Sequence, residues 1–282
     1  MHPEYDLYSS KWAKVRDSIA GEERVKELGS TYLPVLIGQS DAEYNGYKMR
    51  AMFYGASART VQGLTGAIFR KPPEVLFPKS KLEFLEHIGR SQESLEDISK
   101  SLVEEVVGIG RAAVLVDAPN FEDTEPFLAL YWAENIINWL SRPGPDGEMP
   151  VEIVLCEQSQ GRKAEDPFTT EVTTYYRVLR LGAPPGDEPA LQIALESGPV
   201  YYQERWREKK EVVDGKDETS FVLEEVIVPQ MRGGKFLREI PCFVVNASKI
   251  GLKPENPPLL PLVNVNLSHY RSSAYLEHGR HF

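Results

Sequence analysis

Apolar residues recur every three or four positions through the first third of the chain, and this period predicts helices. One helix is expected over residues 9–28, with a break at Gly21. A short helix is expected over residues 81–88, and Ser94 is placed to cap another that reaches Val106. Residues 1–107 are therefore expected to form a helical region.

The longest periodic stretch runs from Asp41 to Pro73. Its apolar and aromatic positions form one helical stripe, its first residue suits an N-cap, and its closing double proline forbids continuation. The pattern predicts a single long central helix, roughly 40 Å in length. Arg50, Arg59 and Arg70 lie beside the stripe among several small residues. The helix could fill the core or contact a neighbouring subunit, and these three arginines are the candidates for such an interface.

The period changes after residue 107, and residues 108–247 are expected to form a β-rich domain. A short helix is expected over Ala133–Leu140, and the neighbouring strands with short turns favour an antiparallel or mixed sheet. The strands are expected at Ala112–Val116, Phe127–Trp132, Val151–Glu157, Glu171–Leu181, Leu191–Leu195, Tyr201–Arg207, Ser220–Val228 and Pro241–Val245.

Residues 248–282 begin with a proline-rich linker, Gly251–Pro261, and continue as a helix over Leu262–Tyr275. The expected fold class is therefore α+β, with helices first, a sheet second and a C-terminal helix last.

Charge narrows the functions that fit this fold. The 282 residues carry a formal net charge of −10, which argues against a surface that grips nucleic acid, because such affinity comes largely from phosphate neutralisation. Between Asp117 and Asp166 there are eleven acidic and three basic residues. This excess suits a solvated acidic face, or a surface that repels DNA and lets it pass. No apolar run is long enough to span a membrane, and no membrane partner is expected.

Motifs for nucleotide binding, serine hydrolysis or zinc proteolysis do not occur in the sequence. Gly108-Ile-Gly110 precedes a strand instead of following one, so it does not indicate a dinucleotide site. His278 and His281, with His269 and Glu277 nearby, resemble a metal-binding cluster. Structural zinc sites usually include cysteine ligands, and no cysteine lies near these residues in the sequence. Asp117 follows a strand, as catalytic carboxylates often do, yet no partner is visible for it. We expect no cofactor, no metal and no catalysis.

Several stretches, in order along nearly the whole chain, together resemble the portal-like proteins of tailed bacteriophages and prophages, in particular a family catalogued as a domain of unknown function. They are Trp12, Val15-Arg16-Asp17, Gly21, Tyr32-Leu33-Pro34, Tyr44, Tyr47, Arg50-Ala51, Arg59-Thr60-Val61, Gly66 to Pro73, Gly110-Arg111, Val114 to Pro119, Tyr131, Glu134 to Trp139, Ile240-Pro241, Pro257 to Leu260, Asn266 to Ser273 and Glu277 to His281.

The resemblance implies a structural protein of the virion that is assembled in the bacterial host cytoplasm. Portal subunits form a ring of about twelve copies at one capsid vertex. The ring contacts capsid proteins, the terminase and a tail adaptor, and double-stranded DNA passes through its channel. The helices and the sheet would form the wing, and Leu262–Tyr275 would lead toward the stem. His269 and Arg271 are the channel-facing candidates. Family members continue beyond the position of Phe282, so this chain is expected to lack C-terminal portal elements.

Two other functions stay open from the sequence. The first is a head–tail adaptor or another capsid interaction protein, which would share the assembly surfaces but not the channel. The second is a metal-assisted hydrolase that uses Asp117 and the terminal histidines.

Overall fold

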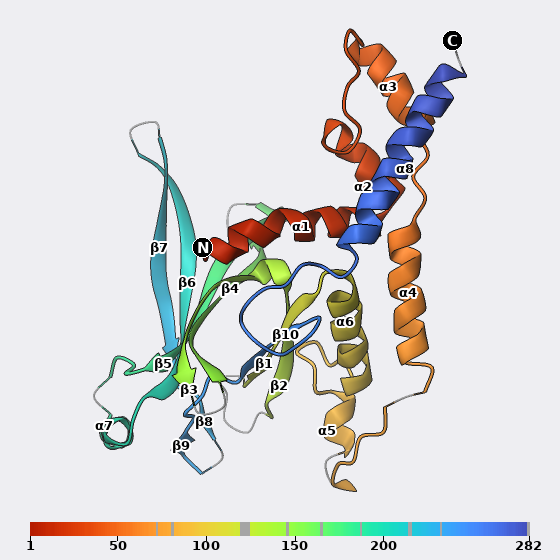
Figure 1. Cartoon of the computed structure of the whole chain (residues 1–282). Helices are drawn as coiled ribbons and strands as arrows, with labels where there is room; N and C mark the ends of the chain where they lie inside the picture. Colours follow the sequence, from red (N-terminus) through yellow and green to blue (C-terminus); the bar gives the residue numbers. More distant parts are fainter. Residues whose placement is uncertain are drawn as a thin grey trace. The chain divides into compact units, whose positions relative to one another are not determined.

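A computed structural model describes residues 1–71, 73–79, 82–118, 125–144, 147–163, 166–186, 188–213, 216–231 and 233–280. The chain forms two compact units (Figure 1). The sheet unit consists of Met1–Tyr5, Ala113–Val244 and Ile250–Lys253. The helical unit consists of Asp6–Ala112, Val245–Lys249 and Pro254–Phe282. No helix among the described residues is both long and apolar enough to cross a membrane.

The helical unit is built from short helices. They are α1 (Pro3–Ala20, from Asp6 onward), α2 (Glu22–Glu27), a 3₁₀ turn (Gly29–Thr31), α3 (Asp41–Arg50), α4 (Ala56–Ile68), α5 (Leu82–Glu86), α6 (Leu95–Gly108) and α8 (Leu260–Gly279). The expected break at Gly21 is confirmed, since its φ of 97° cannot continue a helix. The C-terminal helix is also confirmed and is longer at both ends than expected.

The prediction of one long central helix is wrong. The stretch forms α3 and α4, and residues 51–55 between them belong to neither a helix nor a strand. The cause is tertiary packing. Phe53 is buried against the ring of Tyr270 on α8, with 5.9 Å between ring centroids. Ser273 Oγ lies 3.2 Å from the Met52 amide nitrogen and 3.0 Å from its carbonyl oxygen. These contacts satisfy backbone groups that a continuous helix would have used.

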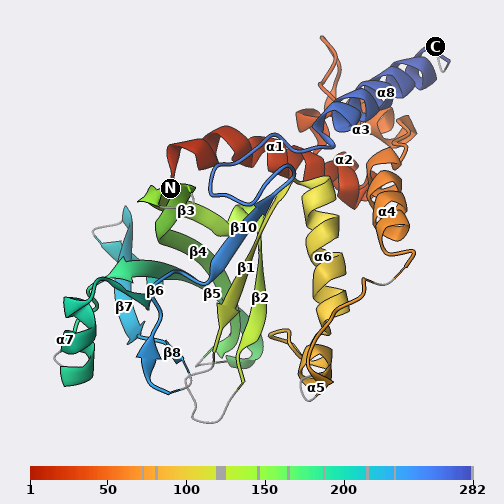
Figure 2. The ribbon, with the colours of Figure 1, turned by 60° about the horizontal axis from the view of Figure 1, so that its bottom comes forward.

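Within the helical unit, α3 lies beside α8, and α4 lies beside both α6 and α8 (Figures 1 and 2). The buried side chains of α4 are Ser57, Val61 and Thr65, which share one face because they are four residues apart. Leu64 and Ile68, which were expected on the buried stripe, are about half exposed.

The predicted N-cap of α6 is confirmed as a capping box. Ser94 Oγ accepts from the Asp97 amide, and the Asp97 carboxylate accepts from the Ser94 amide and hydroxyl. Replacing Ser94 with alanine is expected to lower the free energy of unfolding by about 1 kcal/mol, because the Asp97 amide at the helix start loses its acceptor. Chemical denaturation measures the change, with the exposed Ser272→Ala on α8 as the control. Equal stability of the two variants would contradict the assigned cap.

The sheet unit contains three antiparallel sheets. Their strand orders are β10-β1-β2, β3-β4-β5-β6-β7 and β8-β9. The elements are β1 (Arg111–Asp117, from Ala113 onward), β2 (Phe127–Trp132), a 3₁₀ turn (Ala133–Asn135), β3 (Ile136–Gly144), β4 (Gly147–Lys163), β5 (Asp166–Gly182), α7 (Pro189–Glu196), β6 (Val200–Val213), β7 (Lys216–Ile227), β8 (Gln230–Met231), β9 (Lys235–Phe236) and β10 (Cys242–Asn246, up to Val244).

The core of this unit lies between the three-stranded sheet and one face of the five-stranded sheet (Figure 2). Leu115 on β1, Ile153 and Leu155 on β4, Leu179 on β5 and Tyr201 on β6 are all fully buried there. Because side chains alternate along a strand, every second residue of β4, β5 and β6 points to this core. This inner face also carries the polar network described below.

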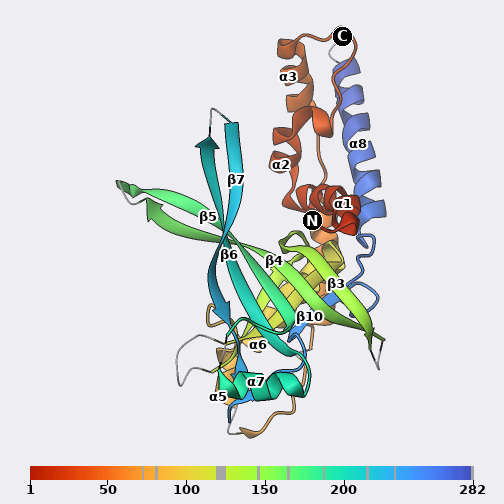
Figure 3. The ribbon, with the colours of Figure 1, turned by 90° about the vertical axis from the view of Figure 1, so that its left-hand side faces the viewer.

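The five-stranded sheet divides into two hairpin arms (Figure 3). Pairing of β5 with β6 begins at Tyr175 and Arg207, and no described residue beyond that pair joins them. Past this point β4 pairs only with β5, and β6 only with β7. The point of divergence is therefore two residues from Arg177, on the inner face of the sheet.

Two local predictions in the sheet unit are wrong. Ala133–Leu140 is a 3₁₀ turn followed by β3. Ile136 and Trp139 both face the core because the register shifts between Ile136 and Asn138, and this shift mimics helical spacing. Leu191–Leu195 lies in α7, where Leu191, Ala194 and Leu195 pack on Val200 and Phe236. Pro189 at the first helical turn was the signal for a helix.

Candidate functional site

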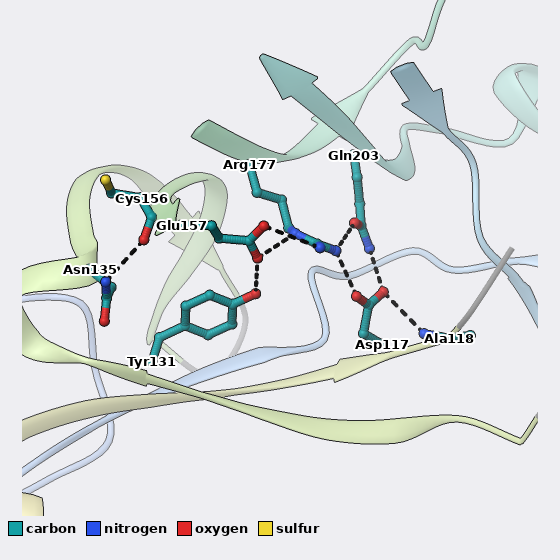
Figure 4. A network of polar contacts seen from close by, with 8 residues as sticks. All are labelled: Asp117, Ala118, Tyr131, Asn135, Cys156, Glu157, Arg177 and Gln203. Carbon is teal, nitrogen blue, oxygen red and sulfur yellow. Dashed lines mark hydrogen bonds and ion pairs between the residues drawn. The ribbon is translucent and has the colours of Figure 1, made fainter. Parts of the chain in front are cut away.

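A buried ion-pair network occupies the inner face of the five-stranded sheet, with Arg177 at its centre (Figure 4). Arg177 Nη1 lies 2.6 Å from Asp117 Oδ2, and its Nε lies 2.9 Å from Glu157 Oε1. The side chains of Arg177, Asp117 and Glu157 are only 14%, 9% and 12% exposed. One guanidinium thus joins two carboxylates that lie on different strands of two sheets.

Neutral side chains complete the network. Gln203 Oε1 accepts from Arg177 Nη1 at 2.9 Å, and Gln203 Nε2 donates to Asp117 Oδ1 at 3.0 Å. The Tyr131 hydroxyl donates to Glu157 Oε1. Asp117 Oδ1 also accepts from the Ala118 amide. Both oxygens of Asp117 therefore have partners, as a buried carboxylate requires.

Arg177 and the nearby Tyr201 both have raised pKa values. Burial by itself lowers the pKa of Arg177, but the attraction of Tyr131, Glu157 and Asp117 outweighs it, so the pKa lies above the ordinary value. Burial, with the nearby Asp117 carboxylate, raises the pKa of the Tyr201 hydroxyl. Arg177 therefore stays charged and Tyr201 stays neutral across the physiological range.

The sequence singled out Asp117 but none of its partners. Arg177 and Gln203 come from β5 and β6, 60 and 86 residues further along the chain. The available signal was the alternation in β5, which places Arg177 on the same face as Leu179. A charge at an inward position needs a buried partner of opposite sign. The hydrolase hypothesis needs Asp117 to be available for chemistry, whereas here its carboxylate is an acceptor in the clamp.

The terminal histidines lie in the helical unit. His278 on α8 packs edge-on against the buried ring of Tyr47, with centroids 5.4 Å apart, and its Nδ1 lies 3.4 Å from Arg50 Nη2. His269 is exposed on the same helix. His281 is outside the described residues. Among the described residues, no group of three or more His, Cys, Asp or Glu side chains could hold a metal ion.

The two channel candidates differ in their surroundings. His269 is exposed, between the exposed Ser268 and the buried Tyr270. Arg271 is partly buried, and its Nε donates to the Tyr32 carbonyl oxygen at 2.9 Å. Arg271 therefore ties α8 to the turn before α3, while His269 is available at the surface.

The three interface candidates, Arg50, Arg59 and Arg70, differ in their burial and contacts. Arg50 is partly buried beside His278. Arg59 is exposed on α4, where its Nη1 donates to the Tyr54 hydroxyl at 3.0 Å and its guanidinium covers the Tyr54 ring. Arg70 is exposed just after α4. Among the described residues, Arg59 and Arg70 form no ion pair.

Large apolar side chains are exposed over the helical unit. On α3, the segment after it, α4 and α8 they are Met49 (76%), Met52 (58%), Tyr54 (54%), Leu64 (47%), Ile68 (55%), Val265 (68%), Tyr275 (57%) and Leu276 (57%). Leu7, Ile37 and Leu76 are exposed elsewhere in the same unit. Single exposed apolar residues are ordinary, whereas a group spread over adjacent helices is typical of a contact surface.

Comparison with known proteins does not assign a family. No protein-family model matches the sequence, and no curated protein is significantly similar to it.

Proposed function

We propose that this chain is a structural subunit of a portal-type ring, through which double-stranded DNA passes at a capsid vertex. The observation that carries the proposal is the set of exposed apolar side chains on α3, on the segment after it and on α4. Neighbouring copies in a ring would cover these side chains and remove them from water. The sequence resemblance supplies the identity of the ring, and the exposed helical faces supply the means of assembly.

The exposed face of α8 suits a conduit. Ser268, His269 and Ser272 are exposed and carry no fixed charge. Such a surface offers weak hydrogen bonds to phosphates without the strong salt-dependent grip of a basic stripe. His269 is accordingly the proposed DNA-proximal residue, and Arg271 is proposed to hold α8 in position.

The sheet unit is proposed to be a rigid platform without catalysis. Its only extensive buried polar cluster within the described residues is the Arg177 network, and all of its charged members are paired. Capsid proteins, a terminase and a tail adaptor are the partners implied by a portal role. The two hairpin arms are the parts of this unit proposed to contact them.

Native mass spectrometry of the 282-residue chain tests assembly directly. We expect a closed ring, of about twelve copies as in portals generally, and electron micrographs with an axial opening. A chain that stays monomeric at high micromolar concentration would contradict assembly through these residues. In particles built with this protein, His269→Glu is expected to slow DNA passage, because it places negative charge beside phosphates. His269→Gln is the matched control, and equal packaging by both variants would remove His269 from the channel.

A further inference from the structure

The charges of the helical unit are divided between two segments. Residues 44–73 contain five basic residues and no acidic residue, a net charge of +5. Residues 82–108 contain seven acidic and two basic residues, a net charge of −5. The first segment includes α4 and the second includes α5 and α6. Two adjacent segments of the same unit are therefore equal and opposite in charge.

The basic segment presents a small-residue face flanked by arginines. Arg59, Gly63, Gly66 and Ala67 are exposed on the side of α4 opposite to its buried residues. Arg70 is exposed in the turn that directly follows the end of the helix at Ile68. Space is open beside both glycines. A partner helix can therefore approach the α4 backbone closely between the two guanidinium groups.

The acidic segment presents a complementary helix. Glu96, Lys100 and Glu104 are exposed on one face of α6, while Ile98 and Glu105 are buried on the opposite face. Glu105 is paired with Arg16 within the unit. Glu96 and Glu104 are eight residues apart, roughly 12 Å, and both project to solvent.

The basic face of α4 and the acidic face of α6 cannot form ion pairs with each other within one copy of the chain. Helices α4 and α6 pack side by side, and each exposes the face opposite to the one it buries (Figures 1 and 2). The basic face and the acidic face thus lie on opposite sides of the helix pair. Two different complementary patches on opposite sides define a head-to-tail contact, which closes into a ring when the rotation between copies permits.

We propose that the α4 face, Arg59 to Arg70, docks on the α6 face, Glu96 to Glu104, of a second copy of this chain. The proposal rests on the proposed ring function and names the surfaces that form it. Glu96 and Glu104 of one copy pair with the arginines of the next, and Gly63 and Gly66 let the helices approach closely.

Charge-reversal variants test this pairing. Variant one carries Arg59→Glu and Arg70→Glu, and variant two carries Glu96→Arg and Glu104→Arg. Each alone places like charges in the contact, so each is expected to raise the dissociation constant by about 100-fold or more. Mixing the two restores both contacts in alternation, and native mass spectrometry is expected to find assemblies with equal numbers of each. A control with Arg142→Glu and Lys235→Glu makes the same charge change as variant one, at exposed positions of the sheet unit.

The outcomes separate this inference from the ring proposal. Assembly of both single-sided variants at wild-type affinity would overturn the α4–α6 contact while leaving a ring formed by other surfaces. A monomeric wild-type chain would overturn both. Loss of assembly in each variant, recovery in the mixture and no effect of the control would support the contact. Weakening of the wild-type assembly between 0.1 and 1 M salt, as screening shortens from about 10 to 3 Å, is expected as well.

Discussion

Replacing Arg177 with methionine is expected to lower the free energy of unfolding of the sheet unit by about 3–5 kcal/mol. The substitution keeps much of the side-chain volume but leaves the carboxylates of Asp117 and Glu157 buried without their shared cation. Removing one partner of a buried ion pair costs far more than the pair contributes, because the remaining charge stays desolvated. Gln203 also loses a donor to its amide oxygen.

The measurement is chemical denaturation followed by tryptophan fluorescence. Trp132, Trp139 and Trp206 report on the sheet unit, and Trp12 is the only tryptophan outside it. Arg142→Met, an exposed arginine on β3, is the control and is expected to change stability by less than about 0.5 kcal/mol.

A second-site combination identifies the mechanism. Adding Asp117→Asn and Glu157→Gln to Arg177→Met removes both orphaned charges, and we expect stability to recover in part. A loss caused only by poor packing of methionine would not recover. Equal stability of Arg177→Met and Arg142→Met would show that the network contributes nothing to folding.

The sequence predicted those parts of the fold that depend on local chemistry. Ser94 caps α6 because its side chain reaches an amide three residues away, and Gly21 breaks the first helix because of its own backbone angle. The strands that line the core, except β3, were predicted from short apolar runs. Each of these features requires only neighbours in sequence, so a pattern of a few residues contains the whole cause.

The errors came from contacts between distant residues. Whether residues 51–55 continue a helix is decided by Tyr270 and Ser273 on α8, more than 200 positions away. The apolar positions keep the helical period both before and after residues 51–55, so periodicity alone could not reveal the break. The Arg177 network was missed for the same reason, since its members come from five strands. Only the inward position of Arg177 in β5 pointed to a buried partner.

Gly110 belongs to the Gly108-Ile-Gly110 stretch, and in the structure it lies at the end of α6. It follows the last turn of α6 with a φ of +86°, and its amide donates to the Glu105 carbonyl oxygen. Its carbonyl accepts from the Ala247 amide. A Cβ at this position would lie 2.7 Å from Pro258 Cδ. The glycine thus lies at the end of α6, at the point where Pro258, in the segment before α8, approaches its backbone.

Replacing Gly110 with alanine is therefore expected to lower the free energy of unfolding by about 3 kcal/mol. The left-handed backbone is strained for alanine, and the added methyl overlaps a rigid proline ring that cannot rotate away. The matched variant is Gly63→Ala on α4, which sits in a helix with open space around it. It should gain about 0.5–1 kcal/mol at concentrations where the chain is monomeric.

The same pair of variants separates folding from assembly. Gly63→Ala should fold more stably yet assemble less tightly, because the methyl keeps the α6 helix of the next copy from the α4 backbone. Gly110→Ala should lower stability and leave the association of the remaining folded chains unchanged, because it lies outside the proposed contact. A Gly110→Ala variant as stable as the wild type would mean that the α6–β1 junction accepts a side chain, against the 2.7 Å approach of Pro258.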